Sequence, residues 1–139
     1  MIELGRGSAT STASPAAYFA RWIDHDTWPA WDPDTEWARV DGPVAVGTRG
    51  VLKPKRGPKA KFVVSACVPG REYTDTALLP GARLVFQHTV ERIAQGSELR
   101  VLVTIDGPLA FLWAKVMGGG FRDSAQANLD RLVRLVEQP

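Results

Sequence analysis

The chain has 139 residues, and its 17 Lys and Arg residues nearly balance its 15 Asp and Glu residues, leaving a formal net charge of +2. This length suits one domain over residues 1–139. Because the positive and negative residues are nearly equal in number, the charge does not indicate a nucleic-acid-binding protein. The single cysteine, Cys67, excludes an intrachain disulfide, no secretory signal is recognisable, and no apolar run reaches the ~20 residues that span a bilayer. We therefore expect a cytoplasmic protein without membrane insertion.

The first third of the chain predicts a strand followed by two short helices. Residues 2–12 predict a strand weakened by glycine, and Ser14-Pro15 is typical of an N-cap followed by the first helical position. Aromatic and aliphatic residues then recur at helical spacing to residue 23. Asp24-His25-Asp26 ends this helix and can cap a second short turn, while the two prolines of residues 28–33 favour an aromatic elbow.

From residue 35 the pattern changes to short strands separated by turn signals. The predicted strands are residues 35–40, 47–53, 59–68, 72–79, 83–93 and 98–106. Short connections such as Pro69-Gly70 and Pro80-Gly81 join consecutive strands into an antiparallel meander. The later strands alternate apolar and polar residues, which predicts a sheet with one covered face and one wet face.

Residues 107–139 predict one long helix that begins with Pro108 in its first turn. Its apolar residues recur in steps of three and four and are Leu109, Leu112, Trp113, Val116, Met117, Phe121, Ala125, Leu129, Leu132, Val133 and Val136. A stripe this wide must be buried against a broad partner, and a curved sheet is the natural one. The glycines at 118–120 predict a kink or break. They are either a hinge that admits a ligand or a consequence of close packing.

The predicted order is strand, two helices, six strands and a long helix. This is an α+β helix-grip arrangement, β-α-α-β6-α, in which a curved antiparallel seven-stranded sheet wraps around the C-terminal helix. A twisted sheet and a straighter helix do not meet everywhere. The space between them is either filled by large side chains or left as a ligand cavity.

Several short sequence strings, taken in order, resemble those of a known family. They are Ser14-Pro15, Asp24 with Trp28-Pro29 and Trp31, Gly42 with Gly47-Thr48, Phe86 with His88 and Glu91, Gly107-Pro108-Leu109-Ala110, and Leu129 with Leu132. Together they resemble the START-like, or Bet v 1-like, superfamily (SRPBCC), and within it the polyketide cyclase/dehydrase-like proteins. The resemblance implies that a small hydrophobic molecule binds between sheet and helix. It supplies no invariant catalytic set, because this fold hosts many activities.

Three polar residues are candidates for acid–base chemistry. By alternation His88 lies on the apolar face of its strand, where it could bind a ligand carbonyl or move a proton. It could equally be a core histidine satisfied by a neighbour. Tyr73 and Asp75 share one face of their strand; facing inward, they would form a cluster with His88 suited to enolisation or aldol chemistry. The other register would place both in water.

The remaining candidates concern the cavity wall and the surface. The residues predicted to bind the ligand are Trp28, Trp31, Phe86, His88, Trp113, Met117 and Phe121. Core packing is the alternative role for the aromatic residues and Met117. Asp24-His25-Asp26 looks like a catalytic dyad, but capping at a helix end explains these residues. The basic run at 53–61 is a solvated hairpin tip or a contact for an anionic ligand, a membrane surface or RNA.

Three functions remain open on this basis. The first is a binding module for a small hydrophobic or aromatic metabolite, acting as a monomer or homodimer. The second is a cofactor-independent polyketide cyclase or dehydratase. The third is a protein-interaction module whose cavity is filled. We expect no cofactor, no nucleic-acid partner and no metal site, because the histidines and the cysteine are too few for zinc without added carboxylates.

Overall fold

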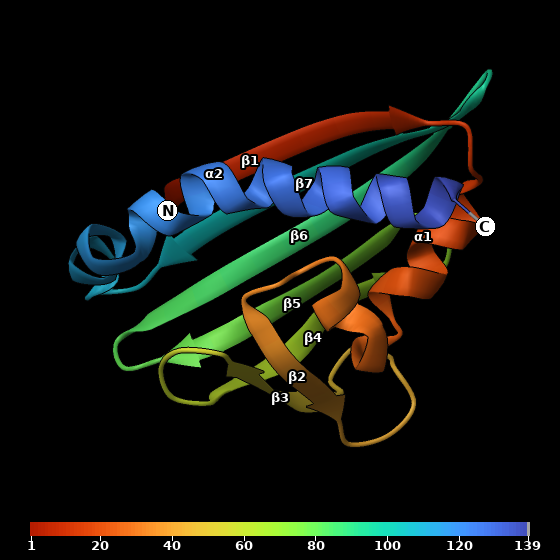
Figure 1. The fold of residues 1–139 in the computed structure, drawn as a ribbon. Coiled ribbons are helices and arrows are strands. Elements are labelled where there is room, and N and C mark those ends of the chain that lie inside the picture. The colour runs from red at the N-terminus through yellow and green to blue at the C-terminus, as the bar shows by residue number, and fades with distance from the viewer. Residues whose placement is uncertain (139) are drawn as a thin grey trace.

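The computed structural model of the protein describes residues 1–138, which form one antiparallel sheet and three helices (Figure 1). The sheet order is β1-β7-β6-β5-β4-β3-β2, so consecutive strands are neighbours except that β1 closes against β7. The strands are β1 Ile2–Ser11, β2 Thr35–Val40, β3 Arg49–Pro54, β4 Ala60–Val68, β5 Glu72–Leu79, β6 Ala82–Ile93 and β7 Gly96–Asp106. The helices are α1 Pro15–Trp22, the 3₁₀ helix η1 His25–Ala30 and α2 Ala110–Glu137. The predicted α+β order is confirmed.

The helices all cover the same face of the sheet. Helix α2 runs along β1 and β7, and α1 with η1 lies beside its C-terminal end, over the other strands (Figure 1). Ser14 caps α1 as expected, because its hydroxyl accepts a hydrogen bond from the Ala17 amide at 3.3 Å. The helices therefore cover one face of the sheet, and η1 lies over the strands that the middle part of the chain forms.

The glycines of β1 let α2 lie directly on the strand backbone. A Cβ atom at Gly5 would stand 2.2 Å from the carbonyl oxygen of Phe121, and one at Gly7 would stand 3.0 Å from the Cα of Gln126. The Gln126 side chain also hydrogen-bonds the backbone of Ser8 at both its amide nitrogen and its carbonyl oxygen. The residues that weaken β1 as an isolated strand are thus the ones that bring the helix close.

Of the two alternatives predicted for the glycines at 118–120, the structure has the kink and not the break. The chain stays helical from Ala110 through these glycines, and the first turns lie at an angle to the rest (Figure 1). A second prediction about α2 is wrong. The stripe is also not buried along its whole length, because Leu109, Leu112 and Val116 are exposed. The helix extends past the end of its covering contacts, so its first two turns have an apolar outer side that faces solvent.

The core is dominated by aromatic residues contributed by α1 and η1. Tyr18 and Trp22 are completely buried, and Trp28 and Trp31 almost completely. The indole N–H of Trp28 donates to the carbonyl oxygen of Trp22 at 3.1 Å, which fixes η1 against α1. The elbow predicted from the prolines is therefore a short 3₁₀ helix, packed as a wall across the open side of the sheet.

Candidate functional site

A cavity of about 870 Å³ lies between the covered face of the sheet and α2. Its apolar wall comes from three sources: the sheet, the helix and the tryptophans of α1 and η1. The sheet supplies Leu52, Phe62, Ala77, Leu84, Phe86, Val101 and Val103, and the helix supplies Trp113, Met117, Phe121, Ala125, Leu129 and Leu132. This volume lies within the range typical of small-molecule sites. The interior is therefore not filled by side chains, which removes the basis of the interaction module proposed for a filled cavity.

The structure places all seven residues predicted to bind the ligand on the wall of this cavity. Trp28 and Trp31 form one end of the wall, Phe86 and His88 lie on β6, and Trp113, Met117 and Phe121 lie on α2. Phe86 and Phe121 meet edge to face across the cavity, with ring centroids 5.5 Å apart. Their position is now fixed, while their role in binding stays a prediction.

Among the titratable side chains that line the cavity, Asp75 and His88 are buried on the central strands β5 and β6. Burial lowers the pKa of His88 to about 4, so its ring is neutral near pH 7. The Nδ1 atom of His88 lies 3.1 Å from the carbonyl oxygen of Tyr73, and it must carry the ring proton to donate this bond. The neutral ring then keeps Nε2 as an acceptor. Burial also raises the pKa of Asp75 to about 7, which leaves this carboxyl ready to give or take a proton at neutral pH.

The predicted inward register of Tyr73 and Asp75 is observed, but the cluster they form has a different third member. The Tyr73 hydroxyl donates to Oδ2 of Asp75 at 3.0 Å, and its oxygen lies 2.8 Å from Nε2 of His25. The ring of His88 lies beside that of Tyr73, with centroids 5.9 Å apart, but its hydrogen bond goes to the Tyr73 backbone, so the expected hydrogen-bonded cluster of Tyr73, Asp75 and His88 side chains does not form. Tyr73 itself is behind the cavity wall, with no exposed surface, and burial raises its pKa well above the ordinary value.

His25 is the polar residue that sequence reasoning missed. Its position between two aspartates favoured a capping role, but its side chain is buried against Trp28 and Phe62, with ring centroids 4.5 and 5.7 Å away. Burial lowers its pKa and favours the neutral ring. A histidine three positions from a tryptophan on each side, in a chain with only two histidines, was the one available signal. Its partner is 48 positions away, which no local pattern reveals.

Two indole N–H groups in the cavity wall have no hydrogen-bond partner among residues 1–138. They belong to Trp22 and Trp31, and both nitrogens are buried. Buried N–H donors without a partner are rare, because each one keeps the cost of leaving water. Neither nitrogen has accessible surface, so these are enclosed donors that a ligand in the cavity reaches only if the rings move.

The mouth of the cavity lies at the end of the molecule where α2 begins. The β3–β4 hairpin contributes Arg56 and Lys59 to it, and the β5–β6 turn contributes Leu78 and Pro80. The indole N–H of Trp113 donates to the carbonyl oxygen of Pro80 at 2.9 Å and ties the start of α2 to that turn. The basic hairpin tip expected from the sequence therefore borders the opening, where solvent and cavity meet.

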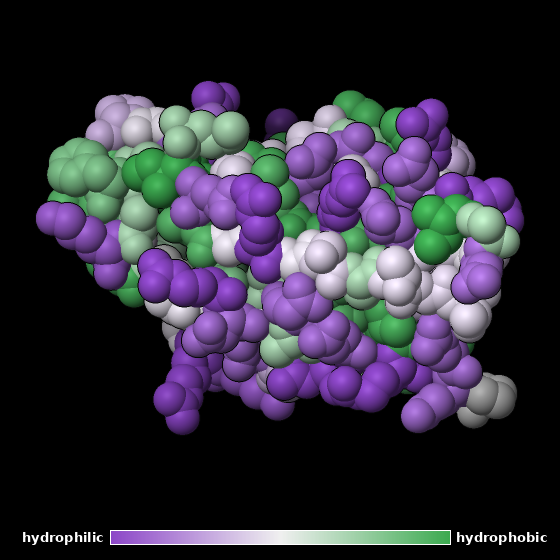
Figure 2. Space-filling model, turned by 90° about the horizontal axis from the view of Figure 1, so that it is seen from above, coloured by the Kyte–Doolittle hydropathy of each residue, from purple (hydrophilic) through white to green (hydrophobic). Residues whose placement is uncertain are grey.

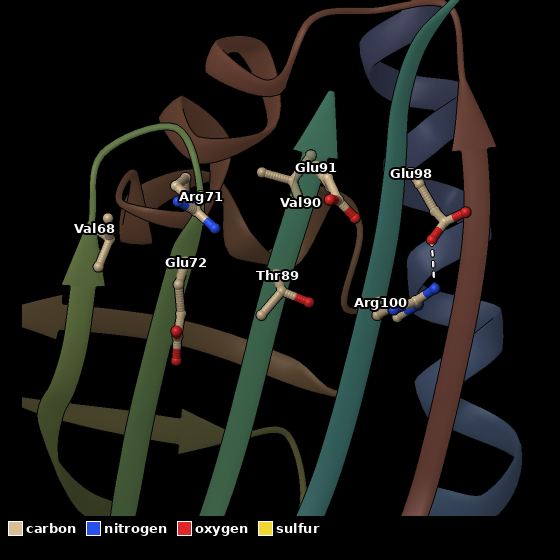
Figure 3. Close-up of a pocket in the computed structure, with 8 residues that line it drawn as sticks. All are labelled: Val68, Arg71, Glu72, Thr89, Val90, Glu91, Glu98 and Arg100. Atoms are coloured by element: carbon tan, nitrogen blue, oxygen red, sulfur yellow. Dashed lines mark hydrogen bonds and ion pairs between the residues drawn. The ribbon is translucent and has the colours of Figure 1, made fainter. Parts of the chain in front are cut away.

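A second hollow, of about 390 Å³, lies on the opposite, solvent-facing side of the sheet (Figure 3). Arginine and glutamate side chains alternate around it, from β5, β6, β7 and the β4–β5 turn (Figure 3). Arg100 is paired with Glu98, which cancels part of the local charge. With both signs of charge beside Val68 and Val90, this hollow offers no distinct ligand chemistry, and the interior cavity is the candidate site.

The family model described as "Polyketide cyclase / dehydrase and lipid transport" matches residues 5–137. The chain belongs to this family. Among curated proteins, none matches the chain. Solved structures of low sequence identity share the fold of this chain. Their likeness to it concerns the fold and not the activity.

Three of these structures show the range of proteins with this fold. A protein from Mesorhizobium loti has a TM-score of 0.70 at 16% identity, covering 96% of both chains. The di-domain ARO/CYC StfQ of the steffimycin biosynthetic pathway has a TM-score of 0.77 at 13% identity, covering 96% of this chain and 50% of StfQ. Ara h 8.0201 has a TM-score of 0.61 at 17% identity, covering 91% and 95% of the two chains. The helix-grip architecture expected from the sequence is therefore confirmed.

Within residues 1–138, no group of three His, Cys, Asp or Glu side chains is placed to hold a metal ion. Over the same residues, no helix combines the length and the apolar composition that crossing a membrane requires.

Proposed function

We propose that this family member binds a small hydrophobic or aromatic molecule in the cavity between the sheet and α2. The observation that carries the proposal is the open cavity of about 870 Å³ with a largely apolar wall. Burying a ligand against such a wall contributes roughly 25 cal/mol per Å² of apolar surface removed from water. The polar groups of Asp75 and His88 would orient an oxygen-bearing part of the same molecule.

The proposed contacts divide by chemistry. Trp28, Trp31, Phe86, Trp113, Met117 and Phe121 would enclose the apolar body of the ligand, as the residues on the cavity wall. The Nε2 atom of His88 would accept a hydrogen bond from a ligand hydroxyl, since Nδ1 is used by the backbone. We propose a cytoplasmic protein that binds its ligand without a cofactor.

Blocking the cavity tests the proposal. Ala125 is buried and lines the cavity, so Ala125→Phe would place a ring inside it. Ala127 lies on the same helix but not on the cavity wall, which makes Ala127→Phe the matched control. Titration with the apolar dye N-phenylnaphthylamine should show saturable binding, weakened roughly tenfold or more by Ala125→Phe and little by Ala127→Phe. Equal affinities for the two variants, or no saturable binding by the wild type, would refute it.

A second candidate function is acid–base catalysis on a polyketide-like substrate. It is favoured by Asp75 and His88, which face one apolar cavity with pKa values moved in opposite directions by burial. Asp75 would take a proton from carbon next to a carbonyl, and Tyr73 would hold the carboxylate in position. Incubation with a poly-β-ketone thioester tests this candidate. Asp75→Asn should abolish product formation while dye binding persists, whereas unchanged product formation would leave only the binding function.

A further inference from the structure

The first two turns of α2 carry apolar residues on both sides of the helix. Trp113 and Met117 line the cavity, while Phe111, Leu112 and Val116 point away from it and are 55%, 48% and 79% exposed. A helix that is apolar all round is normally buried all round. From Arg122 onward the outer side of α2 carries charges instead, so the exposed apolar surface is confined to the start of the helix.

Neighbouring segments extend this surface into one patch. Leu78 of the β5–β6 turn is 54% exposed, and Leu109 packs on Gly81 of the same turn while remaining 40% exposed. Apolar residues gather at the end of the molecule where α2 begins (Figure 2). We call the set Leu78, Leu109, Phe111, Leu112 and Val116 the apolar end patch. It borders the cavity mouth, because Leu78 belongs to both.

Positive charge lies on both sides of this patch. Lys115 projects from the exposed helix turns, and Lys55, Arg56 and Lys59 occupy the β3–β4 hairpin across the mouth. None of these four forms an ion pair within residues 1–138, whereas Lys53 is paired with Glu36. Two acidic residues that also line the cavity, Asp32 and Asp34, precede β2; the backbone oxygen of Asp34 accepts from the Lys55 amide, and burial raises the pKa of Asp32. The hairpin, the β5–β6 turn and the start of α2 lie at the same end of the molecule (Figure 1).

We infer that this end of the protein docks on the surface of an anionic membrane, with the cavity mouth facing the lipid. Exposed aromatic and aliphatic side chains beside lysine and arginine are the combination that binds the interface of acidic bilayers without spanning them. The inference rests on the proposed function and deepens it, because a hydrophobic ligand would pass between membrane and cavity without crossing water. A neutral apolar partner would not account for the cations around the patch.

Vesicle flotation tests the inference directly. The wild-type chain should float with vesicles of mixed phosphatidylcholine and phosphatidylglycerol, and much less with phosphatidylcholine alone. Phe111→Ser combined with Leu112→Ser should weaken binding to the mixed vesicles by roughly tenfold or more. The matched control is Val46→Ser combined with Val68→Ser, which removes two exposed apolar residues outside the patch and should leave binding unchanged.

The charge contribution has its own variant. Lys55→Gln combined with Lys115→Gln removes two cations that do not line the cavity and should weaken binding by roughly thirtyfold, since each such charge contributes about 1 kcal/mol at an anionic surface. Added salt should weaken wild-type binding in the same direction. Absence of binding to mixed vesicles, or equal binding to neutral and mixed vesicles, would overturn the inference.

Two further measurements distinguish membrane docking from dimer formation and from a defect in the cavity. If the patch instead covers a second copy of the chain, sedimentation will show a dimer that Phe111→Ser with Leu112→Ser dissociates, and the inference is wrong. Dye titration of the same double variant should match that of the wild type, because neither residue lines the cavity. Loss of membrane binding with intact dye binding therefore supports docking, while a wild-type chain that binds vesicles but no dye is a failure of the proposed function alone.

Discussion

The Nε2 atom of His25 lies 2.8 Å from the hydroxyl oxygen of Tyr73, which joins a short 3₁₀ helix to the middle of the sheet. The same hydroxyl donates to Asp75, so the position of a cavity-lining carboxyl depends on a residue 50 places earlier in η1 through one shared oxygen. All three side chains are buried, and each hydrogen bond replaces one that water would otherwise supply.

Removing the shared hydroxyl should destabilise the fold. Tyr73→Phe leaves His25 and Asp75 each with one hydrogen bond fewer in a buried site, and we expect a loss of about 1–3 kcal/mol in the free energy of unfolding. Urea denaturation measures this loss. Tyr18→Phe serves as the comparison, because the Tyr18 hydroxyl bonds Ser11, which has a further partner in Glu137. An effect at Tyr73 no larger than that at Tyr18 would argue against a shared network.

Asp75 should make stability depend on pH in a distinctive direction. Its pKa is about 7 in the folded protein and near 3.8 in the unfolded chain, so between these values the folded state binds more protons. Stability from this group therefore falls as pH rises, by at most about 1.4 kcal/mol per pH unit, and the fall is complete above pH 7. His25 and His88 act oppositely below about pH 6.5, because burial lowers both of their pKa values.

The variant Asp75→Asn isolates this contribution. Asparagine keeps an oxygen that accepts from Tyr73 but does not titrate, so the variant should gain stability relative to the wild type as pH rises from about 5 to about 8. Thermal unfolding at a series of pH values gives the difference between the two proteins. A difference that does not change with pH would mean that the pKa of Asp75 is not raised.

The glycines of β1 should be far less tolerant of substitution than glycine normally is in a strand. Gly5→Ala would drive a methyl group to 2.2 Å from the backbone oxygen of Phe121, which cannot move without shifting α2. We expect destabilisation of roughly 2–3 kcal/mol, since overpacking against a rigid backbone is not relieved by side-chain rotation. Denaturant unfolding measures it, and a stability equal to that of the wild type would mean that helix and strand separate more easily than their contacts indicate.

The glycines of α2 should respond in the opposite direction. A Cβ atom at Gly119 or Gly120 meets no other atom within 4 Å, and neither residue has a positive φ. Gly119→Ala and Gly120→Ala should each stabilise the protein by about 1 kcal/mol, because alanine loses less backbone entropy in a helix. These two substitutions also serve as controls for Gly5→Ala.

The same pair of substitutions tests the hinge hypothesis for residues 118–120. If the glycines bend to admit a ligand, the double alanine variant should take up N-phenylnaphthylamine more slowly in stopped-flow fluorescence, with little change in affinity. An unchanged uptake rate would mean that these glycines only set the angle between the first turns of α2 and the rest.

Much of the fold could be predicted from the sequence because its signals are local. Pro69-Gly70 and Pro80-Gly81 mark turns, and the alternation around His88 places that side chain on the covered face, as observed. Turn chemistry and side-chain periodicity act over a few residues, so one sequence is enough to read them. The glycines at 118–120 predicted a kink or a break, and the helix stays continuous with its first turns at an angle, because tertiary contacts and neighbouring turns outweigh a propensity cost of about 1 kcal/mol per glycine.

The tertiary structure alone decided which polar groups meet. His25, Tyr73 and Asp75 are joined only because η1 folds over β5, and nothing in their local patterns relates them. The tertiary structure also leaves the interior open. In addition, the apolar stripe of α2 extends beyond the end of the sheet, so that Phe111 and Leu112 are exposed. Periodicity determines which side of an element is apolar. Whether that side meets a core, a cavity or solvent depends on how far the opposing layer extends, and only the folded chain fixes that distance.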